Sequence, residues 1–143
     1  MAKVKLYPEL EVPEMLLADR RSAYGLRTYV SLFSSAGVGC YGFKEEGFYC
    51  VATVELLERR LKIQKFNQKC VYNSGYICGD MTTQETKDKV FAELAMWERG
   101  FNLTDLDVLI ATPPCQGMSV ANHKKKDELK RNRSEERRVG KEC

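Results

Sequence analysis

Residues 28–42, TYVSLFSSAGVGCYG, decide the fold class, because a strand-like run passes directly into a glycine-bearing turn. The first part, TYVSLFSS, is β-branched and aromatic, and such residues favour a strand. In the second part, Gly37, Gly39 and Gly42 follow the order Gly-x-Gly-x-x-Gly, and glycines at a turn let the backbone approach a ligand closely. Glycine pairs after a strand are equally typical of plain turns. The stretch therefore predicts a ligand site only if further strand-end residues join it.

Strand-like and helical segments alternate along the rest of the chain. Residues 47–54, 74–80 and 106–112 have the pattern of strands, and residues 55–66 and 83–100 have the pattern of surface helices. In the second helix, Thr82 or Thr83 is the expected N-cap and Gly100 the expected stop. This alternation predicts an α/β fold with a doubly wound, mostly parallel, Rossmann-like sheet. Ligands of such sheets bind outside the carboxyl ends of the strands.

Acidic residues stand at the ends of the second and third predicted strands. Glu55 lies 22 positions after Phe33, near the roughly 20-residue spacing at which an acid reaches a ribose in nucleotide-binding folds. Asp80 ends the third strand. Each acid has a second reading, because acids also favour the first turn or the cap of a helix. Three strand-end features in succession favour an adenosine-type ligand.

Cys115 follows the fourth predicted strand within ATPPCQGMS, residues 111–119. Pro113 and Pro114 each fix a φ angle and so restrict the loop that carries the sulfur, whereas Gly117 loosens the other side. A free thiol has a pKa of about 8.5, so only a few per cent is thiolate at neutral pH, which is enough for a well-placed nucleophile. The alternative is a buried, inert cysteine. The remaining cysteines inside the fold, which lack such a frame, are interpreted as packing residues with free thiols: Cys40, Cys50, Cys70 and Cys78.

Charge and composition bound the function. The 143 residues are 43% hydrophobic and 30% charged, as in a single soluble domain. The formal net charge of +3 comes from residues 122–143, which hold nine Lys/Arg and five Asp/Glu. Residues 1–121 carry a net charge of −1 and give no electrostatic case for nucleic acid. The first residues contain no apolar stretch typical of a secretory signal, which predicts a cytoplasmic protein.

The two ends of the chain are set apart from the body. Residues 1–28 contain Pro8 and Pro13, which interrupt any long helix, and only a short helix over residues 14–26 is compatible with them. Residues 133–143, RSEERRVGKEC, resemble the translation of a sequencing-library adapter. They are interpreted as a non-native tail and the chain as a fragment. The alternative is a genuine charged terminal helix.

Four segments together resemble the amino-terminal half of the cytosine-5 DNA methyltransferase family. SLFSSAGVGCYGF resembles the first motif, Phe-x-Gly-x-Gly, and ATVELLERR resembles the second. GDM resembles the third motif, and ATPPCQGMS resembles the fourth, Pro-Cys-Gln, which holds the nucleophile. The motifs occur in order over about residues 29–122. The resemblance implies a truncated S-adenosyl-L-methionine-dependent methyltransferase fold, with an extension at 1–28, the catalytic half-domain at 29–132 and the tail at 133–143.

The resemblance also implies a role for each matched residue. Cys115 is the implied catalytic nucleophile, Glu55 the acid that binds the ribose hydroxyls, and Asp80 the contact to the adenine amino group. The implied S-adenosyl-L-methionine-binding residues are Phe33, Ser35, Ala36, Gly37, Glu55, Leu56, Asp80, Met81 and Pro113. The implied substrate-binding residues are Pro114, Gln116 and Ser119, and no metal ligand is implied.

The sequence departs from the family pattern in two respects. Ser35 stands where the first motif usually has glycine, and Val38 stands where a second adjacent glycine is common. The family's Glu-Asn-Val motif, its later Arg-x-Arg motif, its target recognition domain and its closing motif have no counterpart in the 143 residues. The expected activity of the parent enzyme is methylation of carbon 5 of cytosine in DNA, and this polypeptide alone is expected to be inactive.

Two other functions are consistent with the motifs. An RNA cytosine-5 methyltransferase that modifies transfer RNA would share this architecture, and a nucleotide-binding module without catalysis would use Cys115 only for structure. For the DNA enzyme, the expected partners are a double-stranded DNA substrate and, in a prokaryotic restriction–modification setting, a cognate restriction endonuclease. The protein is expected to be monomeric and to have no membrane partner.

Overall fold

The computed structural model describes residues 25–103 and 105–114. In chain order the elements are β1 (Thr28–Leu32), a 3₁₀ turn η1 (Val38–Cys40), α2 (Tyr41–Glu45), β2 (Tyr49–Glu55), α3 (Glu58–Phe66), a second 3₁₀ turn η2 (Asn73–Gly75), β3 (Tyr76–Cys78), α4 (Gln84–Phe101) and β4 (Val108–Ala111). All four predicted strands and both predicted helices are therefore present within these residues. The predicted short helix over residues 14–26 falls almost wholly outside the described part.

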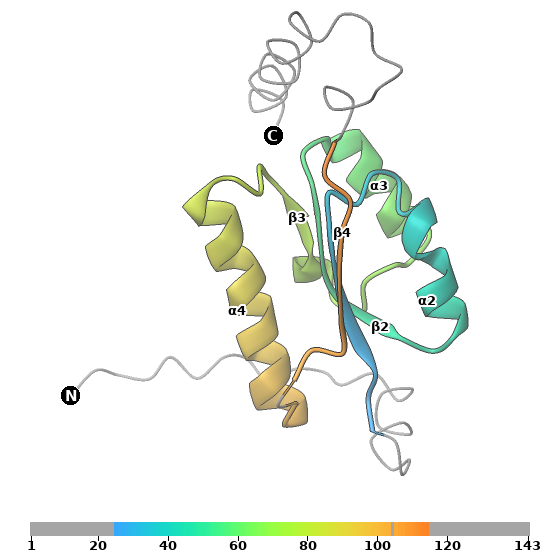
Figure 1. The fold of residues 1–143 in the computed structure, drawn as a ribbon, viewed down its shortest axis with the longest axis vertical. Coiled ribbons are helices and arrows are strands. Elements are labelled where there is room, and N and C mark those ends of the chain that lie inside the picture. The colour runs from blue at the N-terminus through green and yellow to red at the C-terminus, as the bar shows by residue number, and fades with distance from the viewer. Residues whose placement is uncertain (1–24, 104, 115–143) are drawn as a thin grey trace, which may run out of the picture.

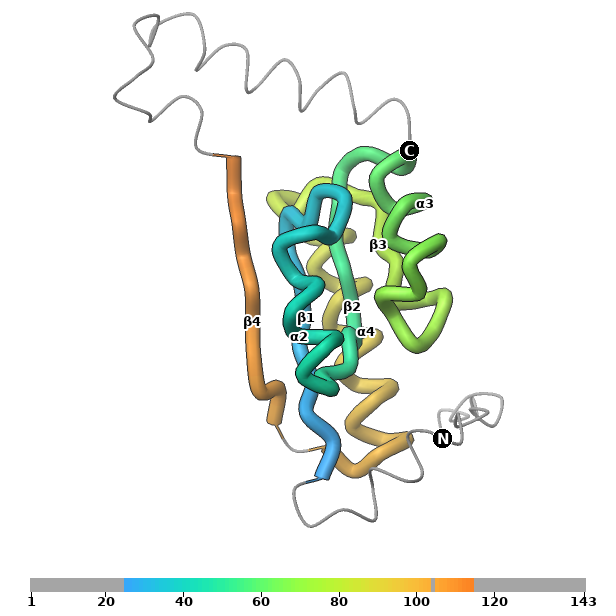
Figure 2. Tube along the Cα trace, turned by 90° about the vertical axis from the view of Figure 1, so that its right-hand side faces the viewer, coloured from blue at the N-terminus to red at the C-terminus, as the bar shows by residue number. Residues whose placement is uncertain are grey.

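The four strands form one parallel sheet in the order β3-β2-β1-β4. Helix α4 covers one face of this sheet, while α2 and α3 cover the other (Figure 1). The chain proceeds from β1 outward to β2 and β3, and then returns to the other side of β1 to add β4 at the edge (Figure 2). The predicted doubly wound parallel sheet is confirmed, and the reversal of strand order falls between β1 and β4.

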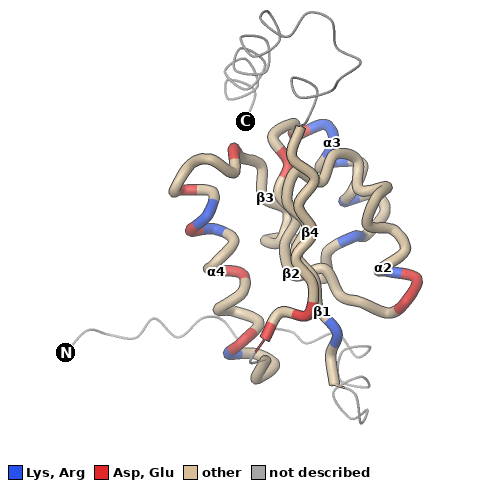
Figure 3. Tube along the Cα trace, in the orientation of Figure 1, with Lys and Arg blue, Asp and Glu red and all other residues tan. Residues whose placement is uncertain are grey.

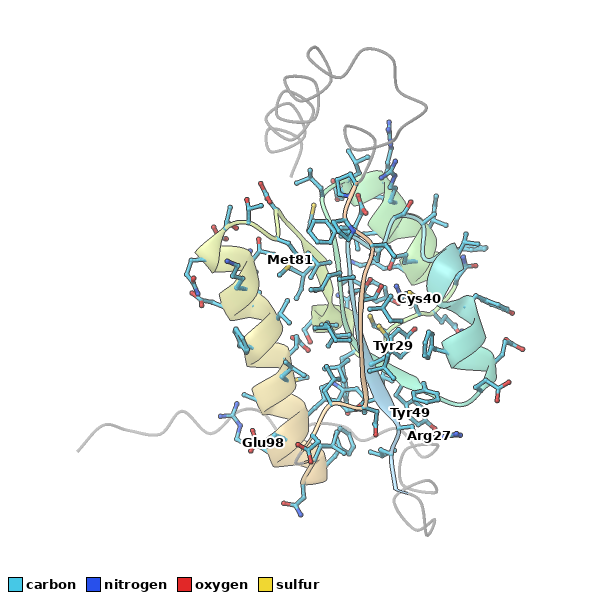
Figure 4. All side chains as sticks on the ribbon, in the orientation of Figure 1. Arg27, Tyr29, Cys40, Tyr49, Met81 and Glu98 are labelled. Atoms are coloured by element: carbon cyan, nitrogen blue, oxygen red, sulfur yellow. The ribbon has the colours of Figure 1, made fainter. Side chains whose placement is uncertain are left out.

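Successive side chains of β1 pack alternately into two separate hydrophobic clusters. On the α4 face, Val30 packs with a cluster of buried side chains that includes Val54, Ile77, Val90 and Trp97. On the other face, Tyr29 packs with Cys40, Cys50 and Cys70, and its ring contacts Phe43 at a centroid distance of 5.4 Å. Figure 4 shows Tyr29 and Cys40 on the α2 side of the sheet. The period-2 alternation of a strand thus produces a three-layer arrangement.

The cysteines divide into two kinds. Cys40, Cys50 and Cys70 are free and buried, as predicted, and burial raises the pKa of the Cys70 thiol far above its ordinary value. These residues act as small apolar groups in the core. Cys78 is the exception, because its sulfur is disulfide-bonded, and the prediction of a free thiol is wrong at this position.

The ends of α4 test the capping signals. Thr83 is the N-cap, and its hydroxyl accepts a hydrogen bond from the Thr86 amide, as predicted. The expected stop at Gly100 is wrong by one residue. The helix continues to Phe101, whose ring centroid lies 4.9 Å from that of Trp97. Its C-cap is Asn102, which adopts a left-handed conformation with a φ of 54°. Burial of Phe101 therefore extends the helix past the glycine.

Candidate functional site

The carboxyl ends of the strands bring the predicted site residues to one edge of the sheet, at the top of Figure 1. The loop after β1, Glu55 at the end of β2, Asp80 after β3 and Pro113 after β4 all lie there. Two hydrogen bonds join neighbouring strand ends at this edge: the Gly79 amide donates to the Glu55 carbonyl at 3.1 Å, and the Thr112 amide donates to the Leu32 carbonyl at 3.3 Å. The parallel topology is therefore what gathers residues that are far apart in sequence.

The loop after β1 has an unusual backbone. Phe33, Ser35 and Gly37 have φ values of 55°, 52° and 86°. Only glycine adopts this left-handed region without strain. A Cβ at Gly37 would also lie 3.1 Å from the Gln64 side chain. Gly37 is thus required by the turn itself, whereas a Cβ at Gly39 would meet no atom within 4 Å. The prediction that these glycines let the backbone approach a ligand stays a prediction.

Glu55 binds this loop directly. Its Oε2 accepts a hydrogen bond from the Ser35 amide at 2.7 Å. Its Oε1 accepts from the Leu57 amide at 3.1 Å and from the Arg60 guanidinium at 3.4 Å. The side chain is only 6% exposed. A carboxylate offers about four acceptor positions, so these three bonds leave capacity for one more donor.

A buried polar network that was not predicted from the sequence supports the same loop. Gln64, 1% exposed on the inner side of α3, donates from Nε2 to the Ser34 hydroxyl at 2.8 Å and to the Ser35 carbonyl at 2.5 Å. Its Oε1 lies 2.7 Å from the Thr53 hydroxyl, and Lys69 donates to that hydroxyl at 3.0 Å. A glutamine on the helix face that packs against the sheet was the available signal, because buried polar groups need partners.

Asp80 has a local structural role. Its Oδ1 accepts hydrogen bonds from the amide and the hydroxyl of Thr82, both at 2.8 Å. Its backbone carbonyl accepts from Thr83, which caps α4. Asp80 thus sets the turn before the helix, while Thr83 is the cap. Its Oδ2 bonds to none of the residues that the structure describes. Met81 follows at the same edge, half-buried against the α4 core, as labelled in Figure 4.

A cleft of about 230 Å³ opens between the loop after β1 and the end of β4. Its lining residues are Ser34, Ser35, Ala36, Val38, Gly39, Cys40, Ile110 and Thr112. The Thr112 hydroxyl donates to the Phe33 carbonyl at 3.1 Å and holds the two walls together. The cleft therefore occupies the point where the strand order reverses, the usual ligand position in such sheets.

The predicted site residues are only partly united in this cleft. Ser35 and Ala36 line it, whereas Gly37 lines a second cavity of about 390 Å³ between η1, α2 and α3. Glu55 reaches the cleft wall through Ser35. The other described candidates lie at the edge without lining the cleft: Phe33, Leu56, Asp80, Met81, Pro113 and Pro114. Cys115, Gln116 and Ser119 lie outside the described residues.

Two kinds of feature are absent from residues 25–103 and 105–114. These residues contain no group of three or more His, Cys, Asp or Glu side chains arranged to hold a metal ion. Their helices include none with the length and apolar character needed to cross a bilayer.

Comparison with known proteins places this geometry in a family. The model of the C-5 cytosine-specific DNA methylases matches residues 27–134. A curated relative, the type II methyltransferase M1.HgaI of Avibacterium volantium, is 38% identical over 92 residues, which are 64% of this chain and 23% of that protein. The chain thus spans about a quarter of the length of this relative. No solved structure matches the chain. Because the family match covers most of the sequence, the chain belongs to the C-5 cytosine-specific DNA methylase family.

Proposed function

We propose that this chain supplies the cofactor-binding and nucleophile-bearing part of an enzyme that methylates carbon 5 of cytosine in double-stranded DNA. One observation carries the proposal. A cleft at the strand-order reversal is bordered by the loop after β1 and by Thr112, the residue directly before Pro113, Pro114 and Cys115. Family membership and the type II methyltransferase relative support the same reaction.

The strand ends fit S-adenosyl-L-methionine, which when bound would supply the methyl group. The acceptor capacity left on Glu55 suits a ribose hydroxyl, and the free Oδ2 of Asp80 suits an amino donor. The loop Phe33, Ser35, Ala36 and Gly37 would border the cofactor with its backbone, because Glu55 and Gln64 hold that loop in one conformation. Leu56, Met81 and Pro113 would complete the apolar surroundings.

Cys115 would act on the cytosine, which such enzymes take out of the duplex before reaction. Its thiolate would add to ring carbon 6 and so make carbon 5 nucleophilic. After carbon 5 has gained the methyl group, a base would remove the carbon 5 proton, and the thiolate would leave as the ring double bond reforms. Pro114, Gln116 and Ser119 would contact the base. The hydrogen bond from the Thr112 hydroxyl to the Phe33 carbonyl supports this arrangement, because Thr112 directly precedes Pro113 and Pro114 in the chain.

The decisive experiment uses an enzyme in which this chain is completed by the remaining family motifs. A duplex containing 5-fluorocytosine should form a stable covalent adduct, because fluorine at carbon 5 cannot leave as the proton does. Mass spectrometry should place the adduct on Cys115. Cys115→Ser should abolish the adduct and lower methyl transfer by several orders of magnitude, because a hydroxyl is not ionised at neutral pH.

Cys70→Ser is the matched control, since Cys70 is buried on the α2 face and does not line the cleft. It should retain the adduct. Methylation by Cys115→Ser at a near-normal rate would refute the nucleophile assignment. An adduct with transfer RNA in place of DNA would move the substrate to RNA. We also propose that the 143-residue chain alone is inactive, because it lacks the Glu-Asn-Val motif.

A further inference from the structure

Helix α3 presents a solvent face on which basic and apolar side chains alternate. Arg59, Lys62, Ile63 and Phe66 follow the spacing i, i+3, i+4, i+7 and so share one side of the helix. Ile63 is 48% exposed and Phe66 is 87% exposed, while Arg59 and Lys62 are also exposed. Leu61 and Gln64 occupy the opposite, buried side. This α3 face, defined by those four residues, therefore points away from the sheet.

The positive charge of the described chain is concentrated on this helix and the turn after it. Residues 58–69 contain five Lys/Arg and one Glu, whereas the other described residues contain five Lys/Arg and ten Asp/Glu. Figure 3 shows Lys and Arg gathered along α3. The body's net charge of −1, from which no nucleic-acid surface was expected, thus averages a basic helix with acidic surroundings.

Helix stability does not explain Arg59 or Phe66. The amino-terminal turn of a helix favours acidic side chains, yet Arg59 and Arg60 stand there. Arg60 pairs with Glu55 at 3.4 Å, and Lys62 lies 3.7 Å from Glu58. Arg59 makes no hydrogen bond or ion pair with any described residue, and Phe66 leaves a large apolar ring in water. A ligand outside this chain would account for both side chains.

We propose that the α3 face binds the phosphate backbone of double-stranded DNA beside the target cytosine, without reading its sequence. The identity of the ligand rests on the proposed function. Clustered Lys and Arg complement phosphates, and an exposed aromatic ring among them adds contact with sugar and base. Helix α3 begins three residues after the end of β2, so its first turn adjoins the edge from which Pro114 leads to Cys115. A duplex held at that edge can extend along α3.

The test is the salt dependence of DNA binding by the complete enzyme, measured with a duplex by fluorescence anisotropy. The variant Arg59→Gln/Lys62→Gln should reduce the slope of log Kobs against log salt concentration by about two, because each lost phosphate contact removes about 0.9. Phe66→Ala should weaken binding without changing the slope, since it removes no charge.

The matched control is Lys87→Gln/Lys89→Gln on α4, at the opposite face of the sheet. It removes the same charge, and Lys89 has the same kind of i,i+4 partner in Glu85 as Lys62 has in Glu58. Its slope should equal that of the unmodified enzyme. Equal slopes for the α3 variant and the control would overturn the proposal.

Failure of this inference is distinguishable from failure of the proposed function. At saturating DNA, the α3 variant should form the Cys115 adduct in full, because Arg59 and Lys62 do not touch the reacting base. If the α3 variant changes the slope but the unmodified enzyme forms no adduct, DNA binding by the α3 face is supported and Cys115 is rejected as the nucleophile. If the adduct forms normally but the α3 variant leaves the slope unchanged, Cys115 is supported and DNA binding by the α3 face is rejected.

Discussion

Ser35 adopts a left-handed backbone conformation in the loop after β1, at the position where the family's first motif usually has glycine. A residue other than glycine in this region is strained by about 1–2 kcal/mol. The φ of Ser35 is 52°, because the loop must turn here to direct the Ser35 amide toward Glu55. This conformation explains why the family usually has glycine at the position. The departure from the motif therefore keeps the geometry and carries strain.

Ser35→Gly should raise the free energy of unfolding, by up to about 1 kcal/mol. Relief of strain exceeds the roughly 0.4–1 kcal/mol by which glycine stabilises the unfolded chain through its extra freedom. Urea denaturation followed by circular dichroism measures the change. Ser34→Gly is the control and should destabilise, because the Ser34 hydroxyl bonds to Val54, Thr53 and Gln64. A Ser35→Gly protein less stable than the parent would show that the loop is not strained.

At the scale of elements, α4 was predictable and α2 was not. Val90 and Trp97 are both buried at helical spacing, and Thr83 gives a clear start. Turn η1 and helix α2 contain Gly39 and Gly42, which lower helix propensity, so this segment read as a turn. Helix α3 was predicted, but the burial of Gln64 on its inner face was not, because apolar periodicity does not detect a buried polar side chain. Sequence patterns therefore report apolar packing and miss contacts made by buried hydrogen bonds.

A buried carboxyl on α4 makes stability depend on pH. Glu93 is 8% exposed, and burial raises its pKa, although a hydrogen bond from Ser74 opposes this shift. The folded protein therefore holds this proton more tightly than the unfolded chain. The associated stability is present below the ordinary pKa of glutamate and is lost as the pH rises through the raised value.

Glu93→Gln should remove that loss. The difference in unfolding free energy between the variant and the parent should increase from about pH 4 to about pH 8, since glutamine does not ionise. Denaturant unfolding across this range measures it. Ser74→Ala should make the parent's trend steeper, because it removes the bond that favours the charged form. A constant difference between Glu93→Gln and the parent would contradict a raised pKa.

At the scale of the whole molecule, the sequence predicted the sheet and the edge at which the site lies. It did not predict the strand order or the cleft, because pairing of β1 with β4 joins Phe33 to Thr112 across 79 positions. No local pattern encodes that contact. The net charge of residues 1–121 also did not reveal that α3 is basic, because acidic residues elsewhere in the chain offset it. The positions of Cys115, Gln116 and Ser119 stay predictions.

The separate character of residues 133–143 also remains a prediction. The family match covers residues 27–134, so most of this segment lies outside it. Deleting 133–143 should leave the thermal unfolding midpoint of the 143-residue protein unchanged, because the tail is expected to make no core contacts. Differential scanning fluorimetry measures this. A midpoint several degrees lower would identify the segment as part of the fold.

The central place of β1 sets the order in which the protein can assemble. β2 and β3 follow β1 closely in the chain. In contrast, Asp107, whose carboxylate accepts a hydrogen bond from the Thr28 amide at 2.6 Å, comes 79 positions after Thr28. Closing so long a loop is entropically costly, and contacts of high sequence separation form slowly. At about 5–20 residues per second, a ribosome exposes the open edge of β1 for several seconds before β4 emerges. The cleft can therefore form only at the end of this period of synthesis. One of its walls, the loop after β1, is made several seconds before the other, the end of β4.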